Sequence, residues 1–180
     1  MSRLHLIALC ILFSALCRAQ SPAGNLRFDL SKIGMVVGGK QICEDAGRIT
    51  DYRSQVMEQI VATGPKSVPV LIAMITDVRI AKTKEPIICY WPGMAIGDLA
   101  FCVLSDLFTD TSLTKATIPG AGWDDMLGPP GELPAWEQLH QYIRKHGRMA
   151  LRAKWQKLWD KYGERMFWDQ KAGCFRLRNG

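Results

Sequence analysis

The stretch that most constrains the fold runs from Met94 to Phe108, near the middle of the chain. It is apolar on nearly every helical face, and its only clearly polar residues are Asp98, Ser105 and Asp106. A helix that is apolar all round must be enclosed by other elements. This one is too short, and carries too many carboxylates, to span a bilayer. The sequence therefore predicts a mainly α-helical fold with this segment as its central core helix.

Two amphipathic helices are expected just before this segment. The first, capped by Asp51, repeats apolar residues at four-residue spacing and ends at Gly64. The second begins at Ser67, which we expect to cap it, and ends at Asp77. Each helix hides only one side, so the pair needs a third element to cover it. The core helix supplies that cover.

The run over residues 56–77 resembles one helical hairpin of the HEAT-type repeat proteins. Those repeats often carry a Gly-containing turn, then Val/Ala-Pro-x-Leu, and an Asp after the second helix. Residues 96–107 are similar to the opening helix of a following repeat. The resemblance covers residues 51–108 and implies an irregular HEAT-like helical-hairpin bundle that binds other proteins. It departs from the family because residues 109–134 hold no clear partner helix, whereas a solenoid normally needs three or more repeats.

The rest of the chain divides into three parts. Residues 109–134 predict a long irregular loop, and loops of that length are usually functional or disordered. Residues 135–165 predict a basic helical part that is interrupted at Gly147. Alternating apolar and basic residues near the C-terminus predict a small β-hairpin over residues 166–178. We expect residues 26–180 to form a single domain.

The N-terminal segment, Met1 to Ala19, has the build of a secretory signal peptide. Arg3 supplies a positive start, Leu6 to Leu16 supplies an apolar run, and small residues precede the expected cleavage site. An uncleaved anchor is the alternative, but the apolar run is short for one. Residues 20–25 are expected to form a disordered leader. We therefore expect export, with a periplasmic or extracellular location after cleavage.

Four cysteines remain after that cleavage: Cys43, Cys89, Cys102 and Cys174. An exported protein can form disulfides, and four cysteines allow three pairings. We take Cys43 with Cys89 as the candidate disulfide, while Cys102 could simply be a small buried apolar residue. The wide spacing matches no zinc pattern, so we expect neither a metal site nor a cofactor.

Positive charge is concentrated in the C-terminal part. Residues 20–134 hold 10 Lys or Arg against 13 Asp or Glu, whereas residues 135–180 hold 11 against 4. This asymmetry indicates either a solvated basic helix face, which we favour, or contact with an anionic surface. The residues of that alternative surface are Arg144, Lys145, Arg148, Arg152, Lys154, Lys157 and Lys161. No nucleic-acid partner is expected, because export removes the usual target.

No recognised catalytic signature occurs in the chain. The two histidines of the processed chain, His140 and His146, are six residues apart and face different sides of one helix, unlike the pair in H-E-x-x-H zinc sites. There is no G-x-S-x-G nucleophile elbow. Residues 34–40 match G-x-x-x-x-G-K formally, but Gln41 stands where that loop needs Ser or Thr. We expect no catalytic residues and lean against an enzyme.

Aromatic and acidic side chains are nonetheless candidates for binding. The candidates are Tyr90, Trp91, Asp98, Trp123, Asp124 and Asp125. Asp98 would either accept backbone N–H bonds or an arginine, which we favour, or serve as a buried functional acid. Trp123 would either fold back onto the helices as an anchor, which we favour, or offer a stacking platform to a sugar or peptide.

The leading hypothesis is an exported, non-enzymatic helical interaction or scaffold protein that binds a protein partner in the cell envelope. The alternative is an envelope-directed hydrolase or a glycan-binding protein that uses Trp123 and nearby carboxylates. A third possibility is binding to anionic surfaces through residues 144–165.

Overall fold

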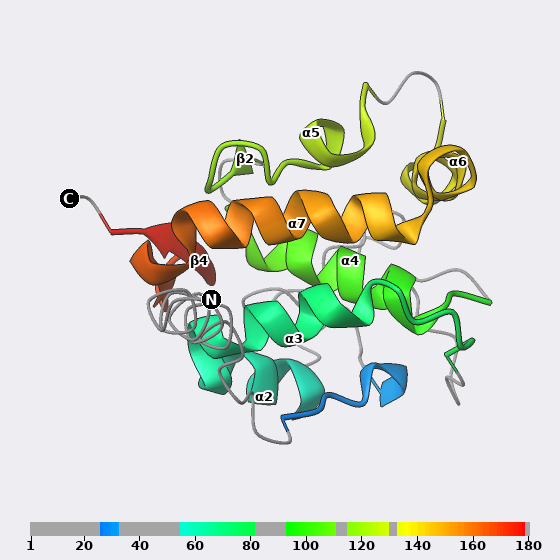
Figure 1. Cartoon of the computed structure of the whole chain (residues 1–180). Helices are drawn as coiled ribbons and strands as arrows, with labels where there is room; N and C mark the ends of the chain where they lie inside the picture. Colours follow the sequence, from blue (N-terminus) through cyan, green and yellow to red (C-terminus); the bar gives the residue numbers. More distant parts are fainter. Residues whose placement is uncertain (1–25, 33–54, 82–92, 111–114, 130–132, 179–180) are drawn as a thin grey trace, which may run out of the picture.

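A computed structural model describes most of the 180-residue chain. The described residues are 26–32, 55–81, 93–110, 115–129 and 133–178. The helices are α2 (Gln55–Thr63), α3 (Ser67–Met74), α4 (Ile96–Leu107), α5 (Trp123–Leu127), α6 (Ala135–His146) and α7 (Arg148–Tyr162), with 3₁₀ turns η2 (Leu30–Lys32), η4 (Gly64–Lys66) and η5 (Gly163–Arg165). The strands are β1 (Thr109–Asp110), β2 (Lys115–Ala116), β3 (Met166–Asp169) and β4 (Cys174–Leu177). The predicted fold class, mainly α with a small C-terminal hairpin, is confirmed (Figure 1).

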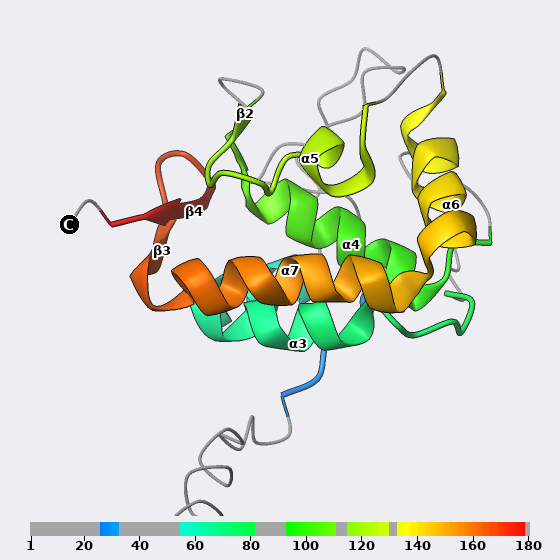
Figure 2. The ribbon, with the colours of Figure 1, turned by 45° about the horizontal axis from the view of Figure 1, so that its top comes forward.

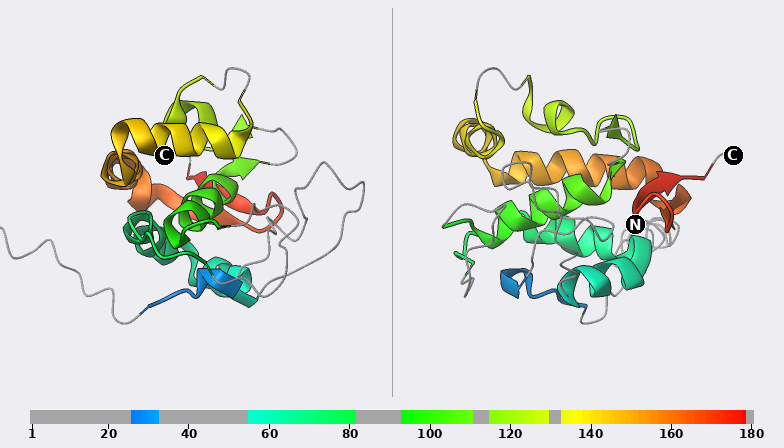
Figure 3. Two further views of the ribbon diagram at one scale, coloured as in Figure 1. Left: turned by 90° about the vertical axis from the view of Figure 1, so that its right-hand side faces the viewer. Right: turned by 180° about the vertical axis from the view of Figure 1, so that it is seen from behind.

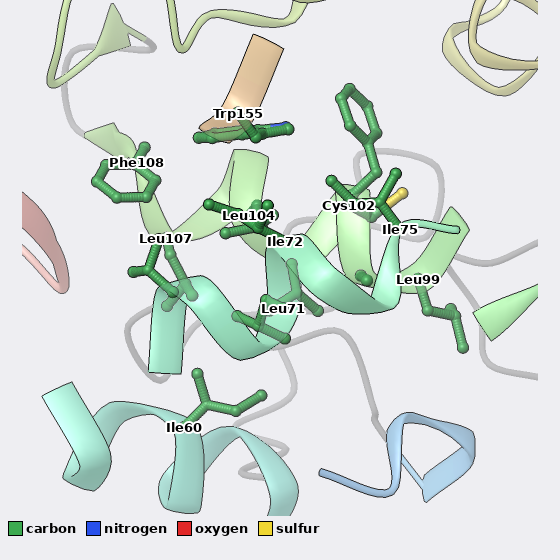
Figure 4. Close-up of a cluster of buried hydrophobic side chains, with 14 of the residues drawn as sticks. Ile60, Leu71, Ile72, Ile75, Leu99, Cys102, Leu104, Leu107, Phe108 and Trp155 are labelled. Carbon is green, nitrogen blue, oxygen red and sulfur yellow. The ribbon is translucent and has the colours of Figure 1, made fainter. Parts of the chain in front are cut away.

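The central helix of the fold is α4, as the sequence predicts. Every residue from Ile96 to Ser105 is buried, and so is Leu107. Helix α3 packs against both α4 and α7. Figure 4 shows side chains of α3 and α4 meeting beneath the indole of Trp155 from α7. Because each fully buried Leu, Ile or Phe contributes about 1.5–3 kcal/mol, this cluster is the main stabilising feature of the domain.

The turn between α2 and α3 differs from the expectation at Ser67. This residue does not cap α3 but is its first helical residue, with φ −71° and ψ −29°. Its hydroxyl donates a hydrogen bond to the carbonyl oxygen of Gly64, at 2.7 Å. An N-cap residue needs an extended backbone to aim its side chain at the helix amides. The 3₁₀ turn Gly64–Lys66 holds Ser67 in a helical conformation instead.

Helix α3 also ends earlier than predicted, at Met74 rather than at Asp77. The carboxylate of Asp77 accepts hydrogen bonds from the side chain of Arg79 in the following turn. The chain then runs alongside the start of α4, where Ile80 and Ala95 form an isolated antiparallel bridge. The end of α3 and the beginning of α4 are thereby tied together through their backbones.

The segment between α4 and α6, predicted as a long loop, contains short ordered elements. Strands β1 and β2 pair antiparallel, with Thr109 opposite Ala116. The single-turn helix α5 begins after Gly122 and ends at Gly128, whose φ is +96°. Glycine is favoured at such a positive φ because it lacks a Cβ. These elements are too short to show any periodicity in the sequence.

Helices α6 and α7 meet at Gly147, where the sequence predicts an interruption, and its φ is +79°. In Figure 1, α7 is seen along its length and α6 end-on, whereas the left view of Figure 3, turned by 90°, shows α6 lengthwise. The two helices therefore cross at a steep angle, as Figure 2 also shows. The predicted hairpin follows α7, with Met166 of β3 opposite Leu177 of β4.

Several predicted features lie outside the described residues. These are the signal peptide (residues 1–19), the leader (residues 20–25), the helix cap at Asp51 and both members of the candidate disulfide, Cys43 and Cys89, so all of them stay predictions. Cys102 and Cys174 are buried free thiols. Among the described helices, none combines the length and apolar character that a bilayer crossing requires.

Candidate functional site

Asp98 is buried in the first turn of α4, and both of its carboxylate oxygens are engaged there. Oδ2 accepts the backbone N–H of Ala95 at 2.9 Å, which satisfies one donor at the helix start. Oδ1 lies 2.7 Å from a guanidinium nitrogen of Arg148, the first residue of α7. The contact is an ion pair without the alignment of a full hydrogen bond. This is the structural role that the sequence favours for Asp98.

Gly97 allows α3 and Arg148 to approach α4 closely. A Cβ at this position would lie 2.1 Å from the carbonyl oxygen of Ile75 and 2.8 Å from Nη1 of Arg148. The same Nη1 donates to the Ile75 carbonyl at 3.4 Å, and the Gly97 N–H donates to the Asp77 carbonyl at 2.9 Å. One guanidinium group therefore joins the end of α3, the start of α4 and the start of α7.

Helix α6 adds an imidazole to this joint. Nε2 of His140 lies 3.8 Å from Oδ2 of Asp98, and its side chain is 32% exposed whereas that of Asp98 is 3% exposed. The ring of Trp136 stands edge-on to His140, with centroids 5.9 Å apart. A chain of contacts therefore leads from the buried carboxylate of Asp98, through His140, to the exposed indole of Trp136. Because both oxygens of Asp98 already have protein partners, the arrangement favours a structural joint over a catalytic acid.

Trp123 is fastened to the fold by both its ring and its indole nitrogen. The Nε1–H donates to Oε1 of Gln138 at 2.8 Å, and Nε2 of Gln138 donates to the carbonyl oxygen of Gly128 at 2.7 Å. The ring packs edge-on against Phe101 of α4, with centroids 4.9 Å apart. This is the anchoring arrangement that the sequence favours for Trp123. The indole donor is consequently already engaged within the protein.

Asp124 and Asp125 lie in the first turn of α5, and both are exposed. The end of this short helix is held by Lys154 of α7, whose Nζ donates to the carbonyl oxygen of Met126 at 2.6 Å. The same ammonium lies 4.9 Å from the ring centroid of Tyr142, on α6. Lys154 therefore ties together three helices, a role that its place in a basic run does not reveal.

Two of the six candidate binding residues, which lie on different helices, contact the same third helix, α6. Asp98 contacts His140 and Trp123 contacts Gln138, and these two α6 residues are nearly adjacent in sequence. Tyr90 and Trp91 lie outside the described residues, so their expected role in binding stays a prediction.

The predicted basic surface is smaller than the sequence suggests. Arg148 and Lys154 are partly buried and bind groups within the protein. Arg152 is also only partly exposed. The exposed members are Arg144, Lys145, Lys157 and Lys161.

Exposed apolar side chains around the Asp98–Arg148 joint were not predicted. Among the residues that the structure describes, the exposed large apolar ones are Val78 (70%), Ile80 (59%), Trp136 (41%) and Met149 (66%), and we call them the end cluster. Each belongs to a segment that contributes to the joint: Val78 and Ile80 follow α3, Trp136 packs on His140, and Met149 is the residue after Arg148. The spacing of apolar residues in the sequence does not distinguish exposed apolar residues from core residues. The position of Met149 among basic residues could, however, have indicated that its side chain is exposed.

A second ion pair, between a buried carboxylate and a partly exposed guanidinium, lies beyond the C-terminal end of α4. The carboxylate of Asp110, in β1, is paired with the guanidinium of Arg176, in β4. Asp169 lies 3.2 Å from the same guanidinium, and its own Oδ1 accepts the backbone N–H of Lys171 in the hairpin turn. This group joins the small β1–β2 pair to the C-terminal hairpin, which gives it a structural role.

Asp106, near the end of α4, is an acid with a raised pKa. Burial raises its pKa from 3.8 to about 7. The nearby thiol of Cys102 has its pKa raised, first by burial and then by the charges of Asp106 and Asp98. A high pKa makes this thiol a poor nucleophile near neutral pH.

Within the part of the chain that the structure describes, no group of three or more His, Cys, Asp or Glu side chains could hold a metal ion. No protein-family model matches the sequence, and neither curated proteins nor solved structures show significant similarity to it. The class of the protein is therefore defined by its own architecture: a mainly helical domain with a C-terminal hairpin, whose elements are joined by buried carboxylates paired with arginines.

Proposed function

We propose that the protein is an exported, non-enzymatic interaction module that binds a protein partner through the end cluster. The observation that supports this most directly is the exposure of the large apolar side chains around the Asp98–Arg148 joint. Exposed apolar groups that gather on a folded domain typically mark an interaction site. Trp, Met and Arg are also enriched in protein interfaces, and Trp is frequent among the residues that dominate binding energy.

The joint beneath the end cluster supports the same proposal. Arg148 and Gly97 hold α3, α4 and α7 close together, so the segments that carry Val78, Ile80 and Met149 are tied to one another. A rigid surface loses less conformational entropy when it binds. The hydrolase or glycan-binding alternative has less support, because Asp98 and Trp123 already engage protein groups.

Two parts of the proposal rest on the sequence. Export follows from the signal-peptide build of residues 1–19, and a repeat-like binding architecture follows from the HEAT resemblance of residues 51–108. N-terminal sequencing of the protein recovered from its producing cells tests export. A mature chain that begins at Gln20 is expected, and a chain that retains Met1 inside the cells would contradict it.

Site-specific photocrosslinking in the producing cells tests the binding surface. A photoreactive amino acid would replace Met149 or Trp136, with Lys171 as the control because it is exposed on the hairpin turn. We expect one adduct of the same mass from positions 149 and 136 and none from position 171. Absence of an adduct at the first two positions, or equal adducts at all three, would contradict the proposed surface.

A further inference from the structure

Most of α6 and α7 carries positive charge without an acidic counterpart, whereas Glu137 and Asp160 lie near the outer ends of the two helices. The chain from Gln138 to Trp159 contains no Asp or Glu. Its basic residues are Arg144, Lys145, Arg148, Arg152, Lys154 and Lys157. Since Arg148 and Lys154 are engaged inside the protein, the charge offered to solvent is concentrated on the remaining members.

Two of these exposed bases stand at the corner that carries Met149. Arg144 and Lys145 lie in the last turn of α6, Gly147 forms the corner, and Met149 lies in the first turn of α7. All three side chains are exposed. A partner that covers Met149 therefore meets two cations at the rim of the contact. Rim charges govern association rate and partner choice more than they govern affinity.

We propose that the end cluster recognises an acidic amphipathic segment of the partner protein. Apolar side chains of that segment cover Met149 and Trp136, and its carboxylates pair with Arg144 and Lys145. This inference rests on the proposed function, because it gives the chemistry of the partner at the same surface.

An anionic membrane presents similar charge, but the arrangement of the apolar groups favours a protein. Helices that lie on a bilayer expose an apolar face along their whole length. In α7 the apolar side chains of Leu151 and Trp155 are instead buried in the core, and only Met149 is an exposed large apolar residue. The remaining members of the cluster come from α6 and from the chain after α3, so the exposed apolar surface is divided among separate segments.

Fluorescence anisotropy with model peptides tests the inference on the full processed chain. The probe is a labelled helical peptide of about 15 residues with a leucine face and a glutamate face. One comparison peptide carries lysine in place of glutamate, and another carries serine in place of leucine. We expect the acidic amphipathic peptide to bind about tenfold more tightly than either comparison peptide. Raising the ionic strength from about 0.05 M to about 0.5 M should weaken its binding severalfold.

Variants of the chain identify the surface. The double variant Arg144→Glu/Lys145→Glu should weaken binding of the acidic peptide by about tenfold, and Met149→Ser should weaken it severalfold. Lys171→Glu, on the distant hairpin turn, should leave the affinity unchanged. Circular dichroism of each variant verifies that the helices remain folded.

Each alternative outcome is distinguishable. Equal affinity for the lysine peptide would overturn the inference, and so would tighter binding to phosphatidylglycerol vesicles that the same variants abolish. If the crosslink at position 149 forms but the acidic peptide does not bind, the proposed function stands and the acidic chemistry is wrong. If both fail, the end cluster is not a binding surface.

Discussion

The guanidinium of Arg148 lies 2.7 Å from the carboxylate of Asp98, joining the start of α7 to the start of α4. Their side chains are only 16% and 3% exposed, so solvent screens the pair weakly. The same guanidinium reaches the carbonyl oxygen of Ile75 at the end of α3. Arg148 therefore ties together the ends of the three helices next to which Val78, Ile80 and Met149 lie.

Substitution of Gly97 by alanine tests how closely these elements approach. In an isolated helix, alanine is more favourable than glycine by about 1 kcal/mol, so helix propensity alone predicts that Gly97→Ala stabilises the protein. The added Cβ would instead lie 2.1 Å from the Ile75 carbonyl oxygen. We expect Gly97→Ala to lower the free energy of unfolding by about 1–3 kcal/mol, as overpacking does, and Gly97→Ser to lower it further. Urea denaturation measures both, and a more stable Gly97→Ala variant would contradict the close approach.

The raised pKa of Asp106 predicts a pH-dependent stability. Between its ordinary value of 3.8 and its folded value of about 7, the folded state keeps a proton that the unfolded state has lost. Stability should therefore fall as pH rises through this window, by at most about 1.4 kcal/mol per pH unit. Asp106→Asn cannot ionise, so it should match the wild type below about pH 4 and exceed its stability near pH 8. Urea titrations across pH measure this, and a wild-type advantage at the higher pH would contradict it.

Two substitutions of Trp155 distinguish the contribution of its buried ring from the effect of its indole N–H. The indole is 1% exposed, and no described residue accepts a hydrogen bond from its Nε1. Trp155→Ala should cost about 3–5 kcal/mol because it leaves a cavity. Trp155→Phe should cost distinctly less, because it also removes an unpaired buried donor worth about 1–3 kcal/mol. Equal losses for the two variants, measured by urea denaturation, would indicate that the N–H has a partner.

The thiols of Cys102 and Cys174 should react slowly in the folded protein. Burial is the main cause that raises both pKa values, and the thiolate is the reactive species. We expect little reaction with a disulfide reagent until urea is added. If Cys43 and Cys89 form the predicted disulfide, the unfolded processed chain should then titrate two thiols, and four after reduction. Rapid labelling of Cys102 without urea would contradict the packing of α4.

The features that depend on local sequence were predictable. An unbroken apolar character revealed α4, a glycine marked the break between α6 and α7, and alternation revealed the C-terminal strand, because each signal is contained in neighbouring residues. The cap expected at Ser67 was wrong because a 3₁₀ turn, which carries no distinct periodicity, precedes α3.

The joint and the end cluster required the three-dimensional structure. Asp98 was recognisable as a buried acid that needs a partner, but nothing in the sequence selects Arg148 over the other basic residues of α6 and α7. Val78 and Ile80 are β-branched apolar residues of the kind usually found in a core, and only the packing of the chain after α3 shows that they are exposed. Pairings and exposures of this kind depend on contacts between distant segments.

A double-mutant cycle on Asp98 and Arg148 tests the central claim most directly. Urea denaturation would be measured for the wild type, Asp98→Asn, Arg148→Met and the double variant, with the exposed Arg144→Met as control. We predict that Arg148→Met alone costs about 3–5 kcal/mol, because it leaves a buried carboxylate without its cation. The cycle should give a coupling energy of about 2–3 kcal/mol. Additive effects, with a coupling energy below about 0.5 kcal/mol, would contradict a joint between α4 and α7.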